Sequence, residues 1–319
     1  MSDTTGHHTA GLRSGPGITE QCFPTPHLAV RGTADQTRVR VFATEQARAA
    51  REVHDRIATR LSGLPTAGRV VVLTAAYDAV VRWRRAVAVS GDARYDSAGR
   101  AAGARYAVTL DQDGPNLDRL GGARLRADAR WDTATRRWTG GSSTPASRIL
   151  DAYQRAALAR FAVEAPDSDV LDNQVTLPSG GRVAGNTLLR GAVARDAAEA
   201  LAERLYARRG VSQVETAGDL LYAVTAPDRS RRLMFAEAMT VLATAGHGDT
   251  AAWWQAAYLL YQAPQYKKGS DAVARVFLVA VGTALLGRPV VLPHDLDLAC
   301  MVLGQTAVVA GPLACGGAA

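Results

Sequence analysis

Two adjacent lysines are the residues best placed to do chemistry in this sequence. Lys267 and Lys268 are the only lysines of the 319-residue chain, and all its other cationic side chains of high pKa are arginines. They lie in "APQYKKGSDAVAR", one glycine before Ser270 and Asp271, residue types that favour the start of a helix. The spacing predicts two ammonium groups beside a helix N-terminus, where free amides and the helix dipole favour phosphate or carboxylate.

The surrounding pattern predicts a loop between two helices. Pro264 should end the first helix near Gln262. Ser270 is expected to be the N-cap of a second, buried helix that ends at Gly287. Arg275, one turn inside that helix, could reach the same anion. The alternative is an ordinary helix–loop–helix in which Ser270 caps the helix and both lysines extend into water, and the sequence leaves both interpretations open.

Further candidates surround this loop. Arg231 and Arg232 stand near the start of another predicted helix, where cations oppose the dipole. They either pair with carboxylates elsewhere or form a second wall of an anion pocket. The predicted anion-binding residues are Lys267, Lys268, Gly269, Ser270, Arg275, Arg231 and Arg232. The predicted proton-transfer residues are Asp271, Tyr266 and Tyr261.

The helix, loop, helix and following "LLGRPVVLP" resemble the core of the Fido fold, the family of Fic and Doc proteins and related plant-pathogen effectors. The family signature is roughly H-P-F-x-x-G-N-G-R-x-x-R, and "GSDAVAR" stands in the place of G-N-G-R-x-x-R. Gly269 matches the first glycine and Arg275 the last arginine, which implies a contact with nucleotide phosphate. The histidine that acts as general base has no counterpart, because Pro264 stands at that offset. The asparagine, second glycine and first arginine are replaced by Ser270, Asp271 and Ala272.

The resemblance covers about residues 187–310 and implies a helical Fido-like core that binds a nucleotide or nucleotide sugar. A hairpin predicted at residues 173–184 would correspond to the family's target-binding flap. Without the histidine, other residues would have to carry group transfer or rearrangement, as in relatives linked to sugar transfer. The alternative is a catalytically inactive binding module that keeps only the scaffold.

A second cluster, His294, Asp295 and Asp297 in "LPHDLDL", could bind a metal ion and make the chain a metal-assisted hydrolase. Its alternative is a helix start capped by Asp295. If this cluster lies at the opposite end of the lysine helix, the two cannot share a substrate. The sequence contains no phosphate-binding loop, dinucleotide fingerprint, nucleophile elbow or zinc-type cysteine spacing, so it leaves the cofactor unknown, with no cofactor as one alternative.

The expected fold is mainly α with small β additions (α+β). Residues 1–36 are predicted to be a flexible arm, 37–144 an α+β segment packed on the core, and 145–319 the helical core. A helix is expected to start at Thr44, a buried helix to cover 69–91, and a small sheet to form from 104–111 and 124–141. In the core, further helices are expected at 147–165, 186–210, 216–226, 230–246 and 250–262.

Composition narrows the function classes. Hydrophobic residues make up 47% and charged residues 21%, which is typical of a globular protein. The net charge of +7 favours an anionic small molecule, but acidic residues are interleaved with the arginines, so nucleic acid is not expected. The apolar stretch 276–287 is too short to cross a membrane.

The setting is also predicted from composition. The three cysteines form no paired motif and no secretory signal is visible, so a cytoplasmic protein is expected. A homo-oligomer stays an open alternative. The alanine- and arginine-rich composition is typical of GC-rich coding, as in actinobacteria, and suggests a role in specialised metabolism.

Overall fold

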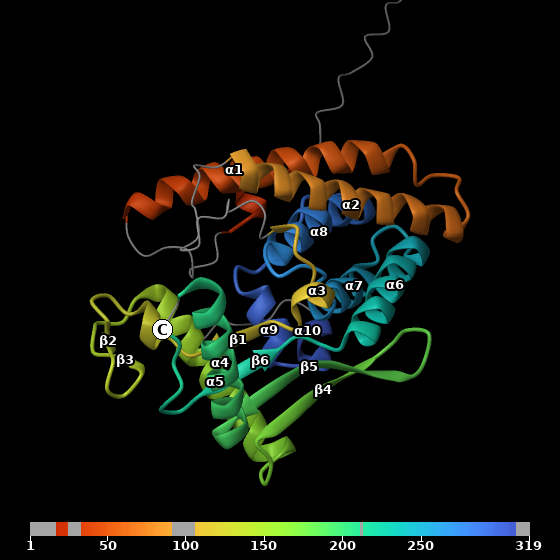
Figure 1. Cartoon of the computed structure of the whole chain (residues 1–319). Helices are drawn as coiled ribbons and strands as arrows, with labels where there is room; N and C mark the ends of the chain where they lie inside the picture. The colour runs from red at the N-terminus through yellow and green to blue at the C-terminus, as the bar shows by residue number, and fades with distance from the viewer. Residues whose placement is uncertain (1–16, 25–32, 91–105, 211–212, 311–319) are drawn as a thin grey trace, which may run out of the picture.

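The computed structural model describes residues 17–24, 33–90, 106–210 and 213–310. Within these ranges the protein is mainly helical with small antiparallel sheets, which confirms the predicted fold class (Figure 1). No helix in the same ranges has both the length and the apolar character that a bilayer crossing requires. Most of the predicted N-terminal arm lies outside the described residues.

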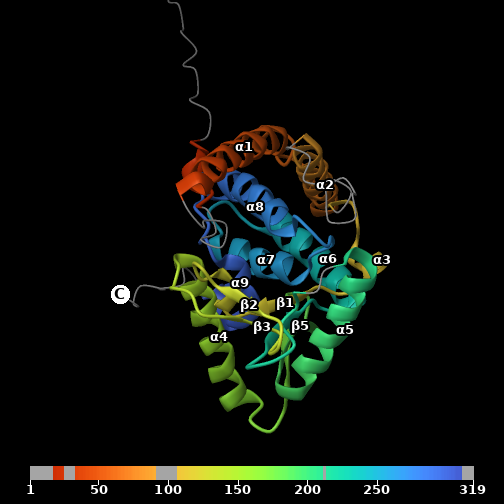
Figure 2. The same cartoon turned by 60° about the vertical axis from the view of Figure 1, so that its left-hand side comes forward.

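Two long helices cover one side of the molecule. α1 (Thr33–Ala58) and α2 (Thr66–Ser90) run side by side over α8 (Ser270–Leu286) (Figures 1 and 2). A short 3-10 helix, Glu20–Cys22, packs on α1 and buries Ile18 and Phe23, so this part of the predicted arm belongs to the core. The predicted cap Thr44 was wrong, since it lies inside α1 and its hydroxyl donates to the carbonyl of Arg40 at 3.0 Å.

The central helices lie where the sequence predicted them. α6 (Asp228–Thr244) and α7 (Thr250–Gln262) pack on one another, and α7 contacts α8. α7 ends at Gln262 as predicted, and α8 ends at Leu286, where Gly287 adopts the left-handed conformation. Every residue of α8 from 272 to 283 is buried. α8 is therefore the central core helix, enclosed on all its sides rather than along one stripe.

A four-stranded antiparallel sheet has the order β1-β6-β5-β4. The strands are β1 (Leu117–Leu120), β4 (Val170–Thr176), β5 (Arg182–Arg190) and β6 (Leu221–Val224). The hairpin predicted at 173–184 is confirmed as β4–β5. The helix predicted at 216–226 was wrong because this stretch forms β6, and 186–190 belongs to β5 rather than to a helix. Short apolar runs fit a buried strand as well as a buried helix, and pairing on both edges of β6 decides for the strand.

A second, two-stranded sheet joins β2 (Arg130–Asp132) and β3 (Arg137–Thr139), as the sequence predicted. The strand predicted at 104–111 was wrong. Among its described residues only Thr109 makes a bridge, with Tyr266, and Leu110 begins the one-turn helix α3 (Leu110–Asp113). This bridge ties the segment before β1 to the lysine loop.

The remaining helices enclose the sheet. α5 (Gly191–Arg209) packs against β5 and β6, and Leu189 and Tyr222 face it. Leu188 and Ala223 point to the opposite face, into the main core. α4 (Pro145–Glu164), α9 (Leu296–Val302) and α10 (Gln305–Val309) complete that side (Figure 1). The sheet thus presents one face to the central helices, and the candidate site lies between them.

Candidate functional site

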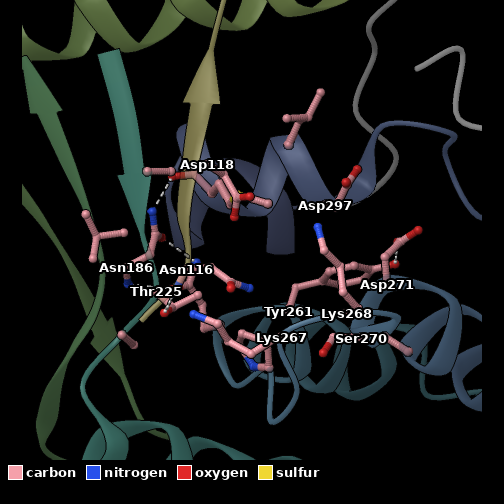
Figure 3. A pocket seen from close by; sticks show the side chains of 18 of the residues that line it. Asn116, Asp118, Asn186, Thr225, Tyr261, Lys267, Lys268, Ser270, Asp271 and Asp297 are labelled. Carbon is pink, nitrogen blue, oxygen red and sulfur yellow. Dashed lines mark hydrogen bonds between the residues drawn. The ribbon is translucent and has the colours of Figure 1, made fainter. Parts of the chain in front are cut away.

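A cavity of about 370 Å³ lies where β1 and β6, α7, the start of α8 and α9 meet (Figure 3). Apolar side chains, among them Leu120, Leu150 and Met301, line part of its wall. The charged residues that line it are Asp118, Arg119, Arg124, Lys267, Lys268, Asp271 and Asp297. The structure therefore brings the lysine loop and the segment of Asp297 into one cavity.

The start of α8 borders this cavity without a side-chain cap. Gly269, not Ser270, is the N-cap, and its φ of 85° lies in the left-handed region. A Cβ at this position would lie 2.9 Å from the ring of Tyr106, so glycine is required on both counts. Ser270 is the first helical residue, and its hydroxyl donates to the carbonyl of Tyr266 at 3.0 Å. Gly269, Ser270 and Asp271 line the cavity, so an uncapped, electropositive helix end faces it.

The two lysines have different surroundings. Lys267 Nζ donates to the carbonyl oxygens of Asp113 (3.3 Å), Gly114 (2.9 Å) and Pro115 (3.1 Å), and its side chain is only 18% exposed. Burial lowers the pKa of Lys267, and the nearby charge of Asp113 opposes this shift. Lys268 is exposed, and its side chain extends into the cavity between Asp118 and Asp297 (Figure 3). Lys268 is thus the ammonium group that can meet a ligand.

This difference can be measured as stability. We expect Lys267→Ala to lower the free energy of unfolding by about 1–3 kcal/mol, because the carbonyl groups that it satisfies lose their donor. Lys268→Ala removes the same chemical group from an exposed position, and its effect should stay within about 0.5 kcal/mol. Urea unfolding of both variants gives the comparison. Equal stability losses would contradict the assignment.

Arg275 is used inside the protein. It is 2% exposed and does not line the cavity. Its Nε donates to Asp271 Oδ1 at 2.8 Å, and its Nη atoms donate to the carbonyls of Pro293 (2.9 Å) and His294 (3.0 Å). The predicted role in holding the anion is therefore corrected, because the guanidinium group is occupied in joining α8 to the loop before α9.

Asp271 and Asp297 form a carboxylate pair on either side of Arg275. Asp271 Oδ1 accepts hydrogen bonds from Tyr261 (3.0 Å) and from Arg275. Asp297 Oδ1 lies 4.0 Å from Arg275 Nη2, and it is buried without a hydrogen-bond partner among the described residues. Burial, together with the charge of Asp271, raises the pKa of Asp297 to about 7, while Arg275 lowers it. Asp297 can therefore gain or lose a proton near neutral pH.

Tyr261 supports this pair. Burial raises the pKa of Tyr261, so its hydroxyl group stays protonated and donates a hydrogen bond to Asp271. Both Tyr261 and Tyr266 line the cavity. The structure thus brings together the three predicted proton-transfer residues and adds Asp297 to them.

A buried polar network fixes the other end of α9 and hence the position of Asp297. Gln262 Nε2 donates to the carbonyl of Cys300 at 2.7 Å. Asn173 and Asn186 each donate to the carbonyl of Met301 at 2.9 Å, and Arg160 donates to that of Val302 at 2.7 Å. The last carbonyls of a helix lack partners within it, and these side chains supply them.

The metal site that the sequence left as an alternative at His294, Asp295 and Asp297 does not form among the described residues. Asp295 Oδ2 accepts a hydrogen bond from Tyr153 at 2.8 Å and lies 3.9 Å from His294 Nε2, while Asp297 faces the cavity. In the part of the chain that the structure describes, no three His, Cys, Asp or Glu side chains are grouped to hold a metal ion. The cluster is divided because Tyr153 engages Asp295. The segment also lies beside the start of α8, not at its opposite end, since Arg275 joins the two.

Arg231 and Arg232 lie outside the cavity lining, which corrects their predicted role as a second wall. Arg231 is buried and donates to Asp111 at 2.7 Å and to the carbonyl of Pro264 at 2.9 Å. Arg232 forms an ion pair with Asp228 in the same helix. Carboxylates therefore neutralise both cations, which was the alternative left open by the sequence.

Sequence reasoning missed the wall formed by β1. Asp118 and Arg124 line the cavity, and Asp118 faces Lys268 across it (Figure 3). The Asp118 side chain is exposed to the cavity, and nearby protein atoms desolvate its carboxyl group only in part. This desolvation raises the pKa of Asp118, and the charges of Lys268 and Arg124 lower it. Nothing local marks Asp118, because its place depends on the pairing of β1 with the distant β6.

No protein-family model and no curated protein matches this chain. The resemblance to the Fido fold therefore stays a prediction from the residues of the lysine loop. A function can still be proposed from the residues that line the cavity.

Proposed function

We propose that this protein is a group-transfer enzyme that binds a phosphate-bearing small molecule of nucleotide or nucleotide-sugar type in the cavity. The observation that carries the proposal is that Lys268 and the uncapped start of α8 share one cavity with Asp297. Lys268 and the uncapped start of α8 both attract a phosphate group. A carboxyl group whose pKa lies near 7 suits general acid–base catalysis.

The reaction would be a displacement at the group that the phosphate carries. The hydroxyl group of an acceptor forms a bond to the transferred group and gives its proton to the Asp297 carboxylate. The bond between that group and the phosphate oxygen breaks, and its electron pair leaves with the phosphate. Lys268 and the amides at the start of α8 stabilise this leaving charge. Tyr261 and Arg275 both donate hydrogen bonds to Asp271 and fix the position of its carboxyl group.

The main rival is a binding module without catalysis. The missing histidine of the resemblance and the internal use of Arg275 favour it. The two proposals predict the same ligand but differ at Asp297, whose removal affects turnover only if the protein is an enzyme.

The proposal also includes the cellular compartment and the biological role. Cys22 and Cys300 are buried free thiols in the described part of the chain, which supports a reducing, cytoplasmic environment. The composition supports a role in actinobacterial specialised metabolism.

Binding of pyrophosphate tests the anion end directly. We expect titration calorimetry to show binding by the full chain and Lys268→Ala to weaken it about 10- to 150-fold, because a charge-assisted hydrogen bond contributes about 1.5–3 kcal/mol. Arg155→Ala removes one cation from an exposed position on α4 outside the cavity, and it should retain the affinity. The proposal fails if the unmodified chain does not bind pyrophosphate, or if both variants bind it equally.

A further inference from the structure

The β1 side of the cavity carries polar side chains that the proposed phosphate end does not use. Asp118 in β1 and Asn116, directly before the strand, both line the cavity, as alternate positions of an extended chain point to the same side. Thr225, opposite Asn116, adds a hydroxyl group. The amide N–H of Asn116 donates to Thr225 Oγ1 at 3.0 Å, and the amide N–H of Thr225 donates to the carbonyl of Asn116 at 3.2 Å. Two neighbouring strands thus fix these side chains together (Figure 3).

These side chains offer both donors and acceptors to a ligand. The Asp118 carboxylate only accepts, the Asn116 amide does both, and the Thr225 hydroxyl keeps a proton to donate. None of the described residues makes a hydrogen bond to the side chain of Asp118 or of Asn116. The groups are therefore available to the cavity, and an apolar ligand surface would leave them unsatisfied.

The charges around Asp118 decide which chemical group fits. Lys268 and Arg124 already act on this carboxylate from within the cavity, and both lower its pKa. A ligand ammonium group would be placed among like charges here. A neutral hydroxyl group carries no such penalty, and it can donate to Asp118 while accepting from Asn116. The mixture of donors and acceptors therefore favours hydroxyl groups over a cation.

Lys267 fixes this wall relative to the phosphate end. Its ammonium group holds the carbonyls of residues 113–115, which directly precede Asn116. Its backbone N–H donates to the carbonyl of Val108 at 3.0 Å. The next residue, Lys268, enters the cavity. One lysine of the pair thus sets the distance between the β1 wall and the ammonium group of the other.

We infer that Asn116, Asp118 and Thr225 form a second subsite, which binds neighbouring hydroxyl groups of the ligand, such as those of a sugar ring. The inference rests on the proposed function, because it assumes that the phosphate of the same ligand lies at Lys268. Asp118 accepts hydrogen bonds from the hydroxyl groups, and Asn116 and Thr225 select their position.

The experiment compares ligands with and without hydroxyl groups. Titration calorimetry would measure pyrophosphate, ADP-ribose and UDP-glucose with the unmodified chain, Asp118→Asn and Asp167→Asn. Asp118→Asn keeps the shape of the side chain at an exposed position, so the variant should fold. Asp167→Asn makes the same change at an exposed residue outside the cavity and serves as control.

We expect at least one of the two sugar-bearing ligands to bind tenfold or more tightly than pyrophosphate. Asp118→Asn should remove most of this gain while pyrophosphate affinity stays equal or rises, and Asp167→Asn should keep the gain. The inference is overturned if neither ligand binds more tightly than pyrophosphate, or if Asp118→Asn preserves the gain. Failure of the unmodified chain to bind pyrophosphate would instead overturn the proposed function.

Discussion

Asp297→Asn is expected to reduce turnover roughly 100- to 10,000-fold while the ligand stays bound, because positioned general-base catalysis contributes about that much. The substitution keeps the size of the side chain but removes the group that accepts the proton. The measurement is the release of nucleoside diphosphate from nucleotide sugars, with binding followed separately by calorimetry. With the unmodified chain, the rate should rise as pH increases through about 7, because the carboxylate form of Asp297 is required.

Asp167→Asn, at an exposed carboxylate outside the cavity, should leave turnover unchanged. Unaltered turnover in Asp297→Asn would contradict the catalytic assignment. A parallel loss of turnover and binding would show that Asp297 only supports the pocket. If no nucleotide sugar reacts but binding persists in every variant, the inactive binding module is the correct alternative.

The titration of Asp297 should also change the free energy of unfolding with pH. The pKa of Asp297 is about 7 in the folded chain, whereas an unfolded aspartate has a pKa of about 3.9. Between these values the folded state holds a proton that the unfolded state has released. Its contribution to the free energy of unfolding is therefore largest at low pH, falls as pH rises from about 4 to 7, and is constant above. Asp297→Asn should remove this slope.

Arg275→Met is expected to lower the free energy of unfolding by about 2–4 kcal/mol, because two backbone carbonyls lose their donor and each such loss costs about 1–3 kcal/mol. Arg275 is 2% exposed, and its loss removes the donor of two backbone carbonyls and one of the two donors of Asp271, which keeps Tyr261. Urea unfolding measures the change, and Arg155→Met, at an exposed position, is the control. A loss below about 1 kcal/mol would contradict the structural role of Arg275.

The α7–loop–α8 unit was predictable because its signals are local. Pro264 cannot continue a helix and Gly287 accepts the left-handed conformation, so both helix ends follow from single residues. The β4–β5 hairpin was predictable in the same way from its proline- and glycine-rich turn. The sequence around the two lysines could not show whether they share one role. Lys267 finds carbonyls near residue 114, far away in the sequence, and only the fold shows this.

The errors have a common physical cause. Residues 216–226 and 186–190 are apolar enough for either a helix or a buried strand. They form strands because β5 and β6 pair with each other, although they are distant in sequence. Likewise Asp297 was read with His294 and Asp295 because the three are close in sequence. Tertiary contacts separate them, since Tyr153 engages Asp295 and the cavity receives Asp297.

The central claim is that Lys268 and the start of α8 hold a phosphate group inside the cavity. A crystal structure of the full chain with a nucleoside diphosphate would test it most directly. The account predicts phosphate oxygens within hydrogen-bond distance of Lys268 Nζ and of the backbone amides that begin α8, with Lys267 still bound to the carbonyls of residues 113–115. A phosphate bound elsewhere on the protein, or a cavity left empty at saturating ligand, would contradict it.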